Sequence, residues 1–303
     1  MKEKRSLIGI DIGGTEIKAI LTNTQGDRLY ETSLPTNDLP GQDNSAVWKS
    51  SVKKLIEELE ARAGDAVHAI GISTPGTVDA THSYVLSNGT KMLGIEGHHW
   101  SDYLNRQVSV LNDAHAALFA ESRLGAGTGF QEVILLTLGT GVGGAIMIHG
   151  KIHTGQIGRA GHLGHMSVNT DNRLDIVQTP GSLEDAIGEC TIRQRSHGCY
   201  ESTQRLVEAY GQGDPFATWV WLQSIQTLSR GIISLINILS PECIILGGGI
   251  TKAGSALISP LHAFMDRYEW RPDGTRTPVV LAQMGNAAGS IGAALFAWEK
   301  MQA

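Results

Sequence analysis

The sequence is poor in the features that mark disulfide-linked, membrane-spanning and nucleic-acid-binding proteins. It has three cysteines in 303 residues and no C-x-x-C pair, so neither a disulfide framework nor a cysteine zinc site is expected. No apolar run approaches the roughly 20 residues that span a bilayer, and the run after the basic start is too short for a signal peptide. A formal net charge of −6 argues against a nucleic-acid surface. These absences favour a globular protein of a reducing, cytoplasmic compartment.

Glycine, by contrast, is plentiful, and it gathers in short motifs. One pattern occurs twice, as LIGIDIGGTEIKAIL at 7–21 and VILLTLGTGVGGAIMIHG at 133–150. Each copy reads as an apolar strand, a Gly/Thr turn and a second apolar strand. Backbone N–H groups of such turns form concave nests that suit phosphate oxygens. Two such hairpins could face each other across a cleft between two lobes, which indicates a nucleotide-using enzyme.

The second copy formally contains the dinucleotide motif G-x-G-x-x-G at 139–144. That motif has mechanical meaning only if a helix follows it. The residues that follow, AIMIHG, read as a strand, so we reject a Rossmann site; no Walker A sequence occurs either. The alternative interpretation of both copies is an ordinary hairpin turn. The hydroxyl residue in each turn, Thr15 and Thr140, favours phosphate binding.

The order of the remaining patterns predicts an α/β duplication, with mixed sheets flanked by helices. At about 150 residues a domain, the length suggests two domains. We expect a small N-terminal lobe at 1–115, completed by the C-terminal helix 288–303, and a large lobe at 116–287. Helices are expected at 45–63 (with Ser45 as a possible cap), 113–123, 185–211, 216–239, 254–268 and 288–301. Further strands are expected at 66–74, 108–112, 243–248 and 278–284.

Two local features suggest ligand contacts. Asp11 lies inside an apolar strand, where a charge is costly unless it is paired or metal-linked. It is interpreted as a carboxylate near Mg²⁺ at the phosphates, with a turn-capping Asp as the alternative. Gly247–Gly249 follows a strand and gives a backbone flat enough to lie against a planar base or ribose. A plain strand-to-helix turn explains these glycines equally well.

Taken together, the motifs resemble the ROK family, which groups bacterial sugar kinases, open reading frames and repressors. The matching segments occur in the family's order: DIGGT at 11–15, Asn112-Asp113, GTGVGG at 139–144, GHLGH at 161–165 and LGGG at 246–249. The resemblance covers essentially the whole chain. It implies an actin-like, ribonuclease-H-like ATPase fold and transfer of the ATP γ-phosphoryl group to a hexose hydroxyl, with Mg²⁺ as cofactor and a homodimer as the expected assembly.

The family assigns the catalytic base to the Asp of its Asn-Asp pair, which is Asp113 here. Asp113 stands where the strand VSVLN meets a helix start. The helix dipole there favours the ionised form, which a base that accepts a hydroxyl proton must have. The rival interpretation is a plain N-cap Asp.

The resemblance implies further site residues. ATP would be bound by Asp11, which also meets Mg²⁺, and by Gly13, Gly14, Thr15, Lys18, Thr140, Gly141, Gly248 and Gly249. The sugar would be bound by Gly76, Asn88, Asn112, Asp113, His162, His165 and Glu184. Asn88 falls where the family has a Pro-Asn contact, but its Asn-Gly pair is also a common turn.

The chain departs from the family pattern on the sugar side. The family's Glu-x-Gly-His, whose Glu and His hold sugar hydroxyls and whose His also binds zinc, is here His162-Leu-Gly-His165. The family's C-x-C-G-x-x-G-C-x-E is matched by 175–184, which keeps Gly181 and Glu184 and has no cysteine. We predict that the structural zinc is missing. His162 offers one acceptor and one donor where a carboxylate accepts two bonds, so the family's sugars do not transfer directly.

Other interpretations stay open. Glu184 could belong to a capping box with Ser182. Trp219 and Trp221, on the expected helix 216–239, are predicted to be core or dimer contacts rather than ligand stacks. A sugar or nucleotide sensor without catalysis is an alternative to a kinase. A repressor on the same scaffold would need an N-terminal DNA-binding module, and the first hairpin begins about six residues into the chain.

Overall fold

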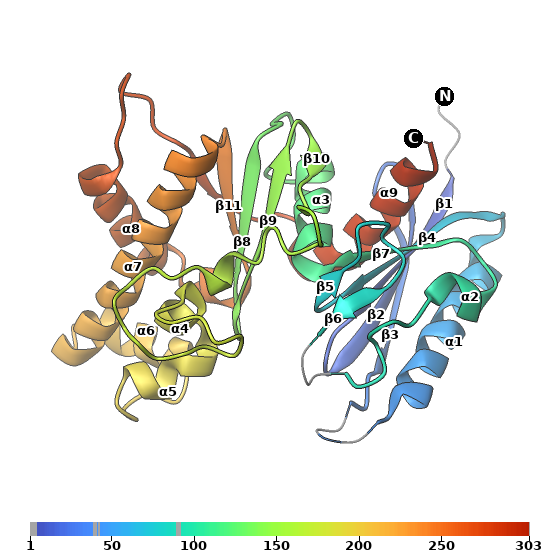
Figure 1. Cartoon of the computed structure of the whole chain (residues 1–303), viewed down its shortest axis with the longest axis horizontal. Coiled ribbons are helices and arrows are strands. Elements are labelled where there is room, and N and C mark those ends of the chain that lie inside the picture. Colours follow the sequence, from blue (N-terminus) through green and yellow to red (C-terminus); the bar gives the residue numbers. More distant parts are fainter. Residues whose placement is uncertain (1–4, 39–40, 42, 89–91, 303) are drawn as a thin grey trace. The chain divides into compact units, whose positions relative to one another are not determined.

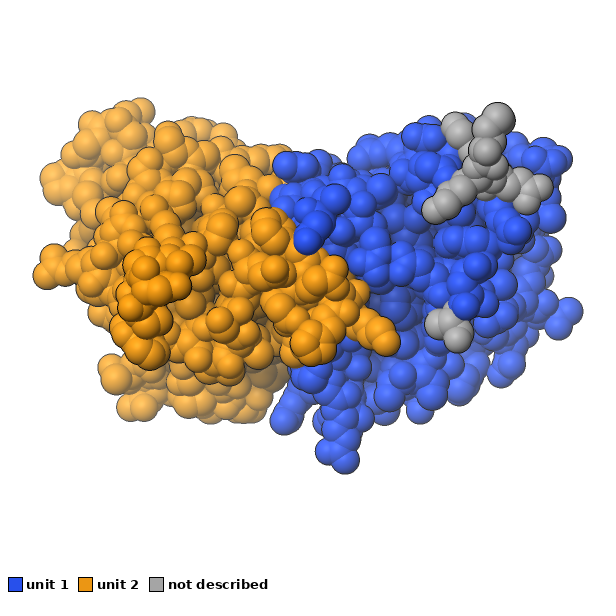
Figure 2. Space-filling view, turned by 90° about the horizontal axis from the view of Figure 1, so that it is seen from above, with its two compact units in different colours: residues 1–129, 152–160, 283–303 blue, residues 130–151, 161–282 orange. Residues whose placement is uncertain are grey.

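The computed structural model describes residues 5–38, 41, 43–88 and 92–302. The chain forms two compact units (Figure 2), and each is described on its own. Unit 1 contains residues 1–129, 152–160 and 283–303, and unit 2 contains 130–151 and 161–282.

The sheet of unit 1 has five strands in the order β3-β2-β1-β4-β7 (Figure 1). These are β1 (Ser6–Ile12), β2 (Glu16–Asn23), β3 (Arg28–Pro35), β4 (Val67–Thr74) and β7 (Val108–Asn112). β2 is antiparallel to both β1 and β3, whereas β1, β4 and β7 run parallel. Two short strands, β5 (Thr77–Val78) and β6 (Val85–Ser87), form a separate small sheet. The expected first hairpin and mixed sheet are confirmed.

The helices of unit 1 are α1 (Ser45–Ala63), α2 (Trp100–Leu104), α3 (Asp113–Leu124), the 3-10 turn η4 (Gly285–Ala287) and α9 (Ala288–Gln302). α1 buries Val52, Leu55, Ile56 and Leu59, as its apolar spacing predicts. The predicted cap is wrong: Ser45 is the first helical residue, the N-cap is Asn44, and neither side chain caps the helix. Instead the Asp43 carboxylate accepts the Ser45 N–H at 2.9 Å.

α9 lies unusually close to the sheet of unit 1. A Cβ added at Gly9 in β1 would lie 1.8 Å from the Ser290 carbonyl oxygen, and one at Gly71 in β4 would lie 1.9 Å from that of Ala293. On another face of the helix, a Cβ at Gly292 would lie 1.8 Å from a carbonyl of α3. Only glycine fits these three positions. α3 therefore packs with α9 in unit 1, although the sequence-based division placed residues from 116 onward in the other lobe.

The sheet of unit 2 repeats this plan, in the order β10-β9-β8-β11-β12. Its strands are β8 (Val133–Leu138), β9 (Val142–Ile148), β10 (Lys151–Ile152, whose last residue belongs to unit 1), β11 (Cys243–Gly247) and β12 (Val279–Leu281). β8 and β9 form an antiparallel hairpin, and β8, β11 and β12 run parallel. The predicted duplication is confirmed by these two matching strand orders.

The helices of unit 2 gather around α7 (Pro215–Leu239), which begins with Pro at its first turn and a cap from Asp214. The others are η1 (Leu163–His165), α4 (Leu183–Ile187), η2 (Glu189–Thr191), α5 (Ile192–Arg195), α6 (Thr203–Gly211), η3 (Gly249–Ala253) and α8 (Ser255–Tyr268). The expected continuous helix over 185–211 is wrong, because extended backbone at Gly188 interrupts it and Ser202 starts a new helix. Within the described part of the chain, no helix combines the length and apolarity needed to cross a membrane.

The two tryptophans of α7 differ in environment. Trp221 is fully buried in the core, and its indole N–H donates to the Ala256 carbonyl at 2.8 Å. Trp219 is 53% exposed and stacks on Phe216. The core interpretation is thus confirmed for Trp221, whereas the dimer contact of Trp219 stays a prediction.

The close approach of α9 yields a stability prediction. Gly71→Ala should lower the free energy of unfolding by about 1–3 kcal/mol, because the new methyl group overlaps the backbone of α9. Gly14→Ala is the matched control, since no atom lies within 4 Å of its added Cβ. Denaturant unfolding measures both variants. Equal midpoints for the two would contradict the close packing.

Candidate functional site

The turn of the first hairpin, Gly13–Thr15, is held by hydrogen bonds with Glu16 and Thr36. The Gly13 N–H donates to the Glu16 carbonyl at 3.0 Å, and the Thr36 hydroxyl and N–H donate to the carbonyls of Gly13 and Thr15 at 2.6 and 3.0 Å. Gly14 and Thr15 are exposed residues, and no acceptor among the described residues engages their N–H groups. A held turn with two successive open N–H groups suits an anion.

Asp11 lies at the end of β1, beneath the first turn of α9. The Ser73 hydroxyl donates to its Oδ1 at 2.7 Å, and Lys18 is its partner across the β1–β2 ladder. A Cβ at Gly289 would come within 2.8 Å of the carboxyl carbon, so the helix start covers the group. Burial raises the pKa of Asp11, and the Ser73 hydrogen bond and the Lys18 charge oppose that rise. The carboxylate caps no turn, since its hydrogen bond comes from a side chain of the neighbouring strand.

The N-terminus of α3 is capped by Asn112. Its side-chain oxygen accepts the N–H groups of Ala114 and His115 at 3.0 and 3.3 Å, and its amide donates to the Gly76 carbonyl at 3.0 Å. Asp113 is the first helical residue and is exposed; its Oδ1 accepts the neighbouring Ala114 N–H at 2.8 Å. The rival interpretation of Asp113 as a plain N-cap is therefore wrong.

The electrostatics of Asp113 differ from the expectation. Desolvation of the carboxyl by the surrounding protein, and then the Asp11 charge, raise the pKa of Asp113 to about 6. Hydrogen bonds from Ala114 and Asn112 offset part of this rise. The expected help from the helix N-terminus is thus outweighed. A carboxyl with this pKa is still mostly ionised at neutral pH, and it accepts a proton more readily than an ordinary aspartate.

Three residues predicted to bind sugar lie together in unit 1. The Gly76 carbonyl accepts the Asn112 amide, and a Cβ at Gly76, whose φ is 97°, would lie 2.9 Å from the Asn88 side-chain oxygen. The Asn88 N–H donates to the Glu96 carboxylate at 2.6 Å. Gly76, Asn88 and Asn112 thus form one polar group at the start of α3, next to Asp113.

In unit 2 the turn of the second hairpin is held by neighbouring backbone and by Glu184. The N–H groups of residues 189–190 donate to the carbonyls of Gly139 and Thr140 at 3.0 and 2.8 Å. The Glu184 carboxylate accepts the Val142 N–H at 3.0 Å. In the part of the chain with coordinates, the N–H groups of Thr140 and Gly141 have no acceptor, which matches the first turn.

The capping box proposed for α4 is only half formed. Ser182 is the N-cap, and its hydroxyl accepts the Asp185 N–H at 3.2 Å. The box position is therefore Asp185, whose carboxylate accepts Arg173 Nε at 2.9 Å instead of reaching back to the cap. Glu184 takes no part in the cap, because it faces the hairpin turn.

In the GHLGH motif His162 is the N-cap of η1 and His165 is its last residue, and η1 packs tightly on β9. A Cβ at Gly164 would lie 1.9 Å from the Val142 carbonyl oxygen. His165 Nδ1 is hydrogen-bonded to Asp175 Oδ2 at 2.8 Å. Burial alone would raise the pKa of Asp175, but hydrogen bonds from Thr179, His165 and Val177 outweigh it and lower the pKa.

These residues do not fit the structural zinc of the family pattern. Asp175 and Ser182 stand where two of the three cysteines would be, and the chain's cysteines are elsewhere, at 190, 199 and 243. Structural zinc sites use four ligands, chiefly thiolate and imidazole. Across the described ranges, no group of three or more His, Cys, Asp and Glu side chains is arranged to hold a metal ion. Among the described residues, the side chain hydrogen-bonded to His165 is the Asp175 carboxylate, which also accepts two backbone N–H groups.

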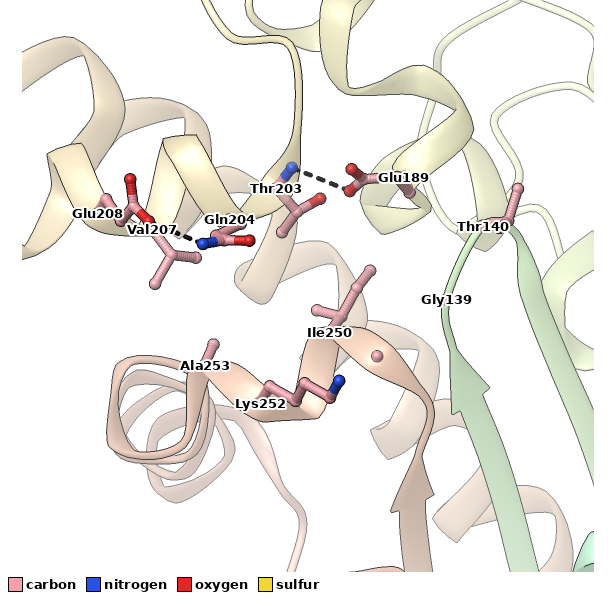
Figure 3. A pocket seen from close by; sticks show the side chains of 11 residues that line it. Gly139, Thr140, Glu189, Thr203, Gln204, Val207, Glu208, Ile250, Lys252 and Ala253 are labelled. Atoms are coloured by element: carbon pink, nitrogen blue, oxygen red, sulfur yellow. Dashed lines mark hydrogen bonds between the residues drawn. The ribbon is translucent and has the colours of Figure 1, made fainter. Parts of the chain in front are cut away.

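Unit 2 also contains a cavity of about 580 Å³ beside the second turn (Figure 3). Its apolar wall is formed by Val207, Ile250 and Ala253, from α6 and η3. The remaining lining residues are Gly139, Thr140, Glu189, Thr203, Gln204, Glu208, Gly249 and Lys252. Its volume, its apolar wall and the adjoining open N–H groups fit a nucleoside with phosphates attached.

Of the residues that line this cavity, the sequence predicts a ligand contact for Thr140 and Gly249 alone. Gly248, also predicted, lies behind the wall: its φ is 89°, and a Cβ there would lie 2.3 Å from the Leu138 carbonyl oxygen. This close approach brings η3 beside the end of β8. The α6 residues were missed because the sequence gives no signal for them; only the fold brings α6 to the hairpin turn.

Comparison with known proteins identifies the family of the chain. The model of the ROK family matches residues 7–300. The chain is 29% identical to the glucokinase of Thermotoga maritima, over 98% of this chain and 99% of the relative. It is 30% identical to the N-acetylgalactosamine kinase of a Shewanella species, over 95% of each.

Solved structures are equally similar. The glucokinase of Streptomyces griseus in complex with glucose and AMPPNP has a TM-score of 0.79 at 28% identity, over 97% of this chain and 99% of that one. The ROK hexokinase of Thermus thermophilus has a TM-score of 0.84 at 26% identity, over 98% and 99%. The fold is thus the actin-like ATPase fold that the resemblance implied, and the chain belongs to the ROK family.

Proposed function

We propose that the protein is an ATP-dependent sugar kinase that transfers the γ-phosphoryl group to a hydroxyl of a hexose or related sugar, with Asp113 as general base. The proposal rests on the surroundings and the raised pKa of the Asp113 carboxylate. Its carboxylate is relieved of capping by Asn112, is exposed, and has a pKa raised to about 6. An aspartate with a purely structural role at a helix start would accept hydrogen bonds from the first N–H groups of the helix.

In this reaction Asp113 accepts the proton of the attacking hydroxyl as the bond to phosphorus forms. Phosphoryl transfer needs little else from the protein beyond alignment and charge compensation. The open N–H groups at Gly14–Thr15 and Thr140–Gly141 supply donors for phosphate oxygens. The cavity of unit 2 supplies a place for the nucleoside.

Asp11 is the proposed contact of Mg²⁺. This ion prefers oxygen ligands and is usually held by one or two carboxylates together with substrate phosphates. Asp11 fits, because it is a carboxylate at a strand end beside a phosphate-type turn, and among the described residues only the Ser73 hydroxyl donates to it. When bound, the ion would neutralise charge on the transferred phosphoryl group.

The sugar-binding roles of Gly76, Asn88 and Asn112 in unit 1, and of His162, His165 and Glu184 in unit 2, are proposed on the family pattern. The relatives do not select one sugar, because a glucokinase and an N-acetylgalactosamine kinase are similar to this chain at 29% and 30% identity. The homodimer and the cytoplasmic location stay predictions.

The proposal is tested by ADP release over a panel of hexoses, ketoses and N-acetylated sugars. At least one sugar should support turnover, and Asp113→Asn should reduce kcat for it by roughly 10²–10⁴-fold, the usual contribution of a general base. Sugar binding by the variant, measured by calorimetry, should persist. Sugar binding without turnover by the natural protein would instead identify a sensor, and full activity of Asp113→Asn would exclude Asp113 as base.

The raised pKa of Asp113 also predicts a pH profile. The base works only when ionised, so kcat/KM for the sugar should be level above about pH 6.5 and fall about tenfold for each pH unit below about 6. The profile should be measured with saturating Mg²⁺ and ATP. An acid limb near the ordinary aspartate pKa of about 4 would contradict the assignment.

The nucleotide role of the cavity is tested separately. Ala253→Trp should fill the apolar side of the cavity and raise KM for ATP by about tenfold or more, through loss of base contacts. KM for the sugar should stay unchanged. Ala253→Ser is the control, since it keeps the size of the side chain. An unchanged KM for ATP in Ala253→Trp would place the nucleoside elsewhere.

A further inference from the structure

In the family pattern the histidine of this motif binds zinc. In this chain His165 is hydrogen-bonded to Asp175 instead. Asp175 has a fully buried side chain, and its Oδ2 lies 2.8 Å from His165 Nδ1. Its other oxygen, Oδ1, accepts the N–H groups of Val177 and Thr179 at 2.9 and 2.8 Å. Two backbone N–H groups thus donate to this carboxylate, which is the pattern of an ionised group.

An ionised carboxylate can only accept hydrogen bonds, so the hydrogen must be on Nδ1 of His165. In a neutral imidazole one nitrogen donates and the other accepts. When the ring is neutral with its hydrogen on Nδ1, the Nε2 atom has a bare lone pair. The His165 side chain is 26% exposed, and no described residue donates to its Nε2, so the lone pair is available to a ligand.

We propose that Asp175 is a positioning residue that fixes the tautomer of His165, so that Nε2 accepts a hydrogen bond from a substrate hydroxyl. This inference rests on the proposed function for the identity of the ligand. An imidazole bound to a metal through one nitrogen must carry its hydrogen on the other, and so can only donate to a sugar. Replacing the metal by a carboxylate reverses the direction of this hydrogen bond.

The reversal matches the other change in the same motif. Where the family has a glutamate, an acceptor of two hydroxyl bonds, His162 supplies one acceptor at most. A lone pair on His165 Nε2 provides a second acceptor for sugar hydroxyls, three residues after His162. The two substitutions together keep a site that takes hydrogen from sugar hydroxyls, with the acceptors placed differently. This redistribution of acceptors would set which sugar is preferred.

The segment that carries Asp175 is closed without help from His165. Isolated bridges join Ser167 to Ser182 and Leu174 to Pro180, and the Gly181 N–H donates to the Arg173 carbonyl at 3.1 Å. A change of the Asp175 side chain that keeps its turn-forming oxygen should therefore leave the segment folded.

Asp175→Asn is that change. The amide oxygen can still accept the Val177 and Thr179 N–H groups, while the NH₂ group faces Nδ1 and forces the hydrogen onto Nε2. We expect KM for the best sugar of the panel to rise at least tenfold, with KM for ATP unchanged. Long-range ¹H–¹⁵N spectra at pH 8, where protein imidazoles are generally neutral, should show hydrogen on Nδ1 in the natural protein and on Nε2 in the variant.

Asp171→Asn is the matched control, because Asp171 also holds its own turn, through the Arg173 N–H at 3.0 Å, without touching a histidine. It should change neither the spectrum nor either KM. Metal analysis of the purified natural protein should find no stoichiometric zinc. Hydrogen on Nε2 of the natural protein, bound zinc, or an unchanged sugar KM in Asp175→Asn would each overturn the proposal. If no sugar is phosphorylated, the kinase assignment fails, and the spectra still decide the tautomer.

Discussion

The structure of unit 1 depends on the close contact between helix α9 and the backbone of its sheet. Glycine at positions 9, 71 and 292 lets the helix rest on β1, β4 and α3 without intervening side chains. The first turn of this helix covers Asp11, and α3, which it also contacts, begins at Asp113. Two carboxylates from distant parts of the sequence are thus held within electrostatic reach of each other. Desolvation, and after it the Asp11 charge, raise the pKa of Asp113.

In both units one residue caps a helix, and a carboxylate close to it in sequence is left out of the cap. In unit 1 Asn112 caps α3 and leaves the adjacent Asp113 open, and in unit 2 Ser182 caps α4 and leaves Glu184 to hold a hairpin turn. A capping side chain satisfies N–H groups that would otherwise recruit the nearest acceptor. The cap thereby determines which carboxylate is available for other chemistry.

The sequence predicted what local patterns encode. Both Gly/Thr hairpins, the mixed sheets, the helices around 45–63 and 216–239 and the ROK family are confirmed. It could not predict that α6 lines a cavity with Val207, since that placement depends on contacts between elements far apart in sequence. The direction of the Asp113 pKa shift was also missed. Helix position alone suggests a lower value, whereas crowding and a second carboxylate, both set by tertiary structure, raise it.

The pairing of His165 with Asp175 also bears on the chemical robustness of this region. A zinc–thiolate cluster is exposed to oxidation, because each thiolate is a site for peroxide attack and each oxidised sulfur releases the metal. A carboxylate–imidazole hydrogen bond contains no group on that oxidation ladder. The contact between His165 and Asp175 therefore depends neither on a thiolate, which peroxide would oxidise, nor on a supply of zinc.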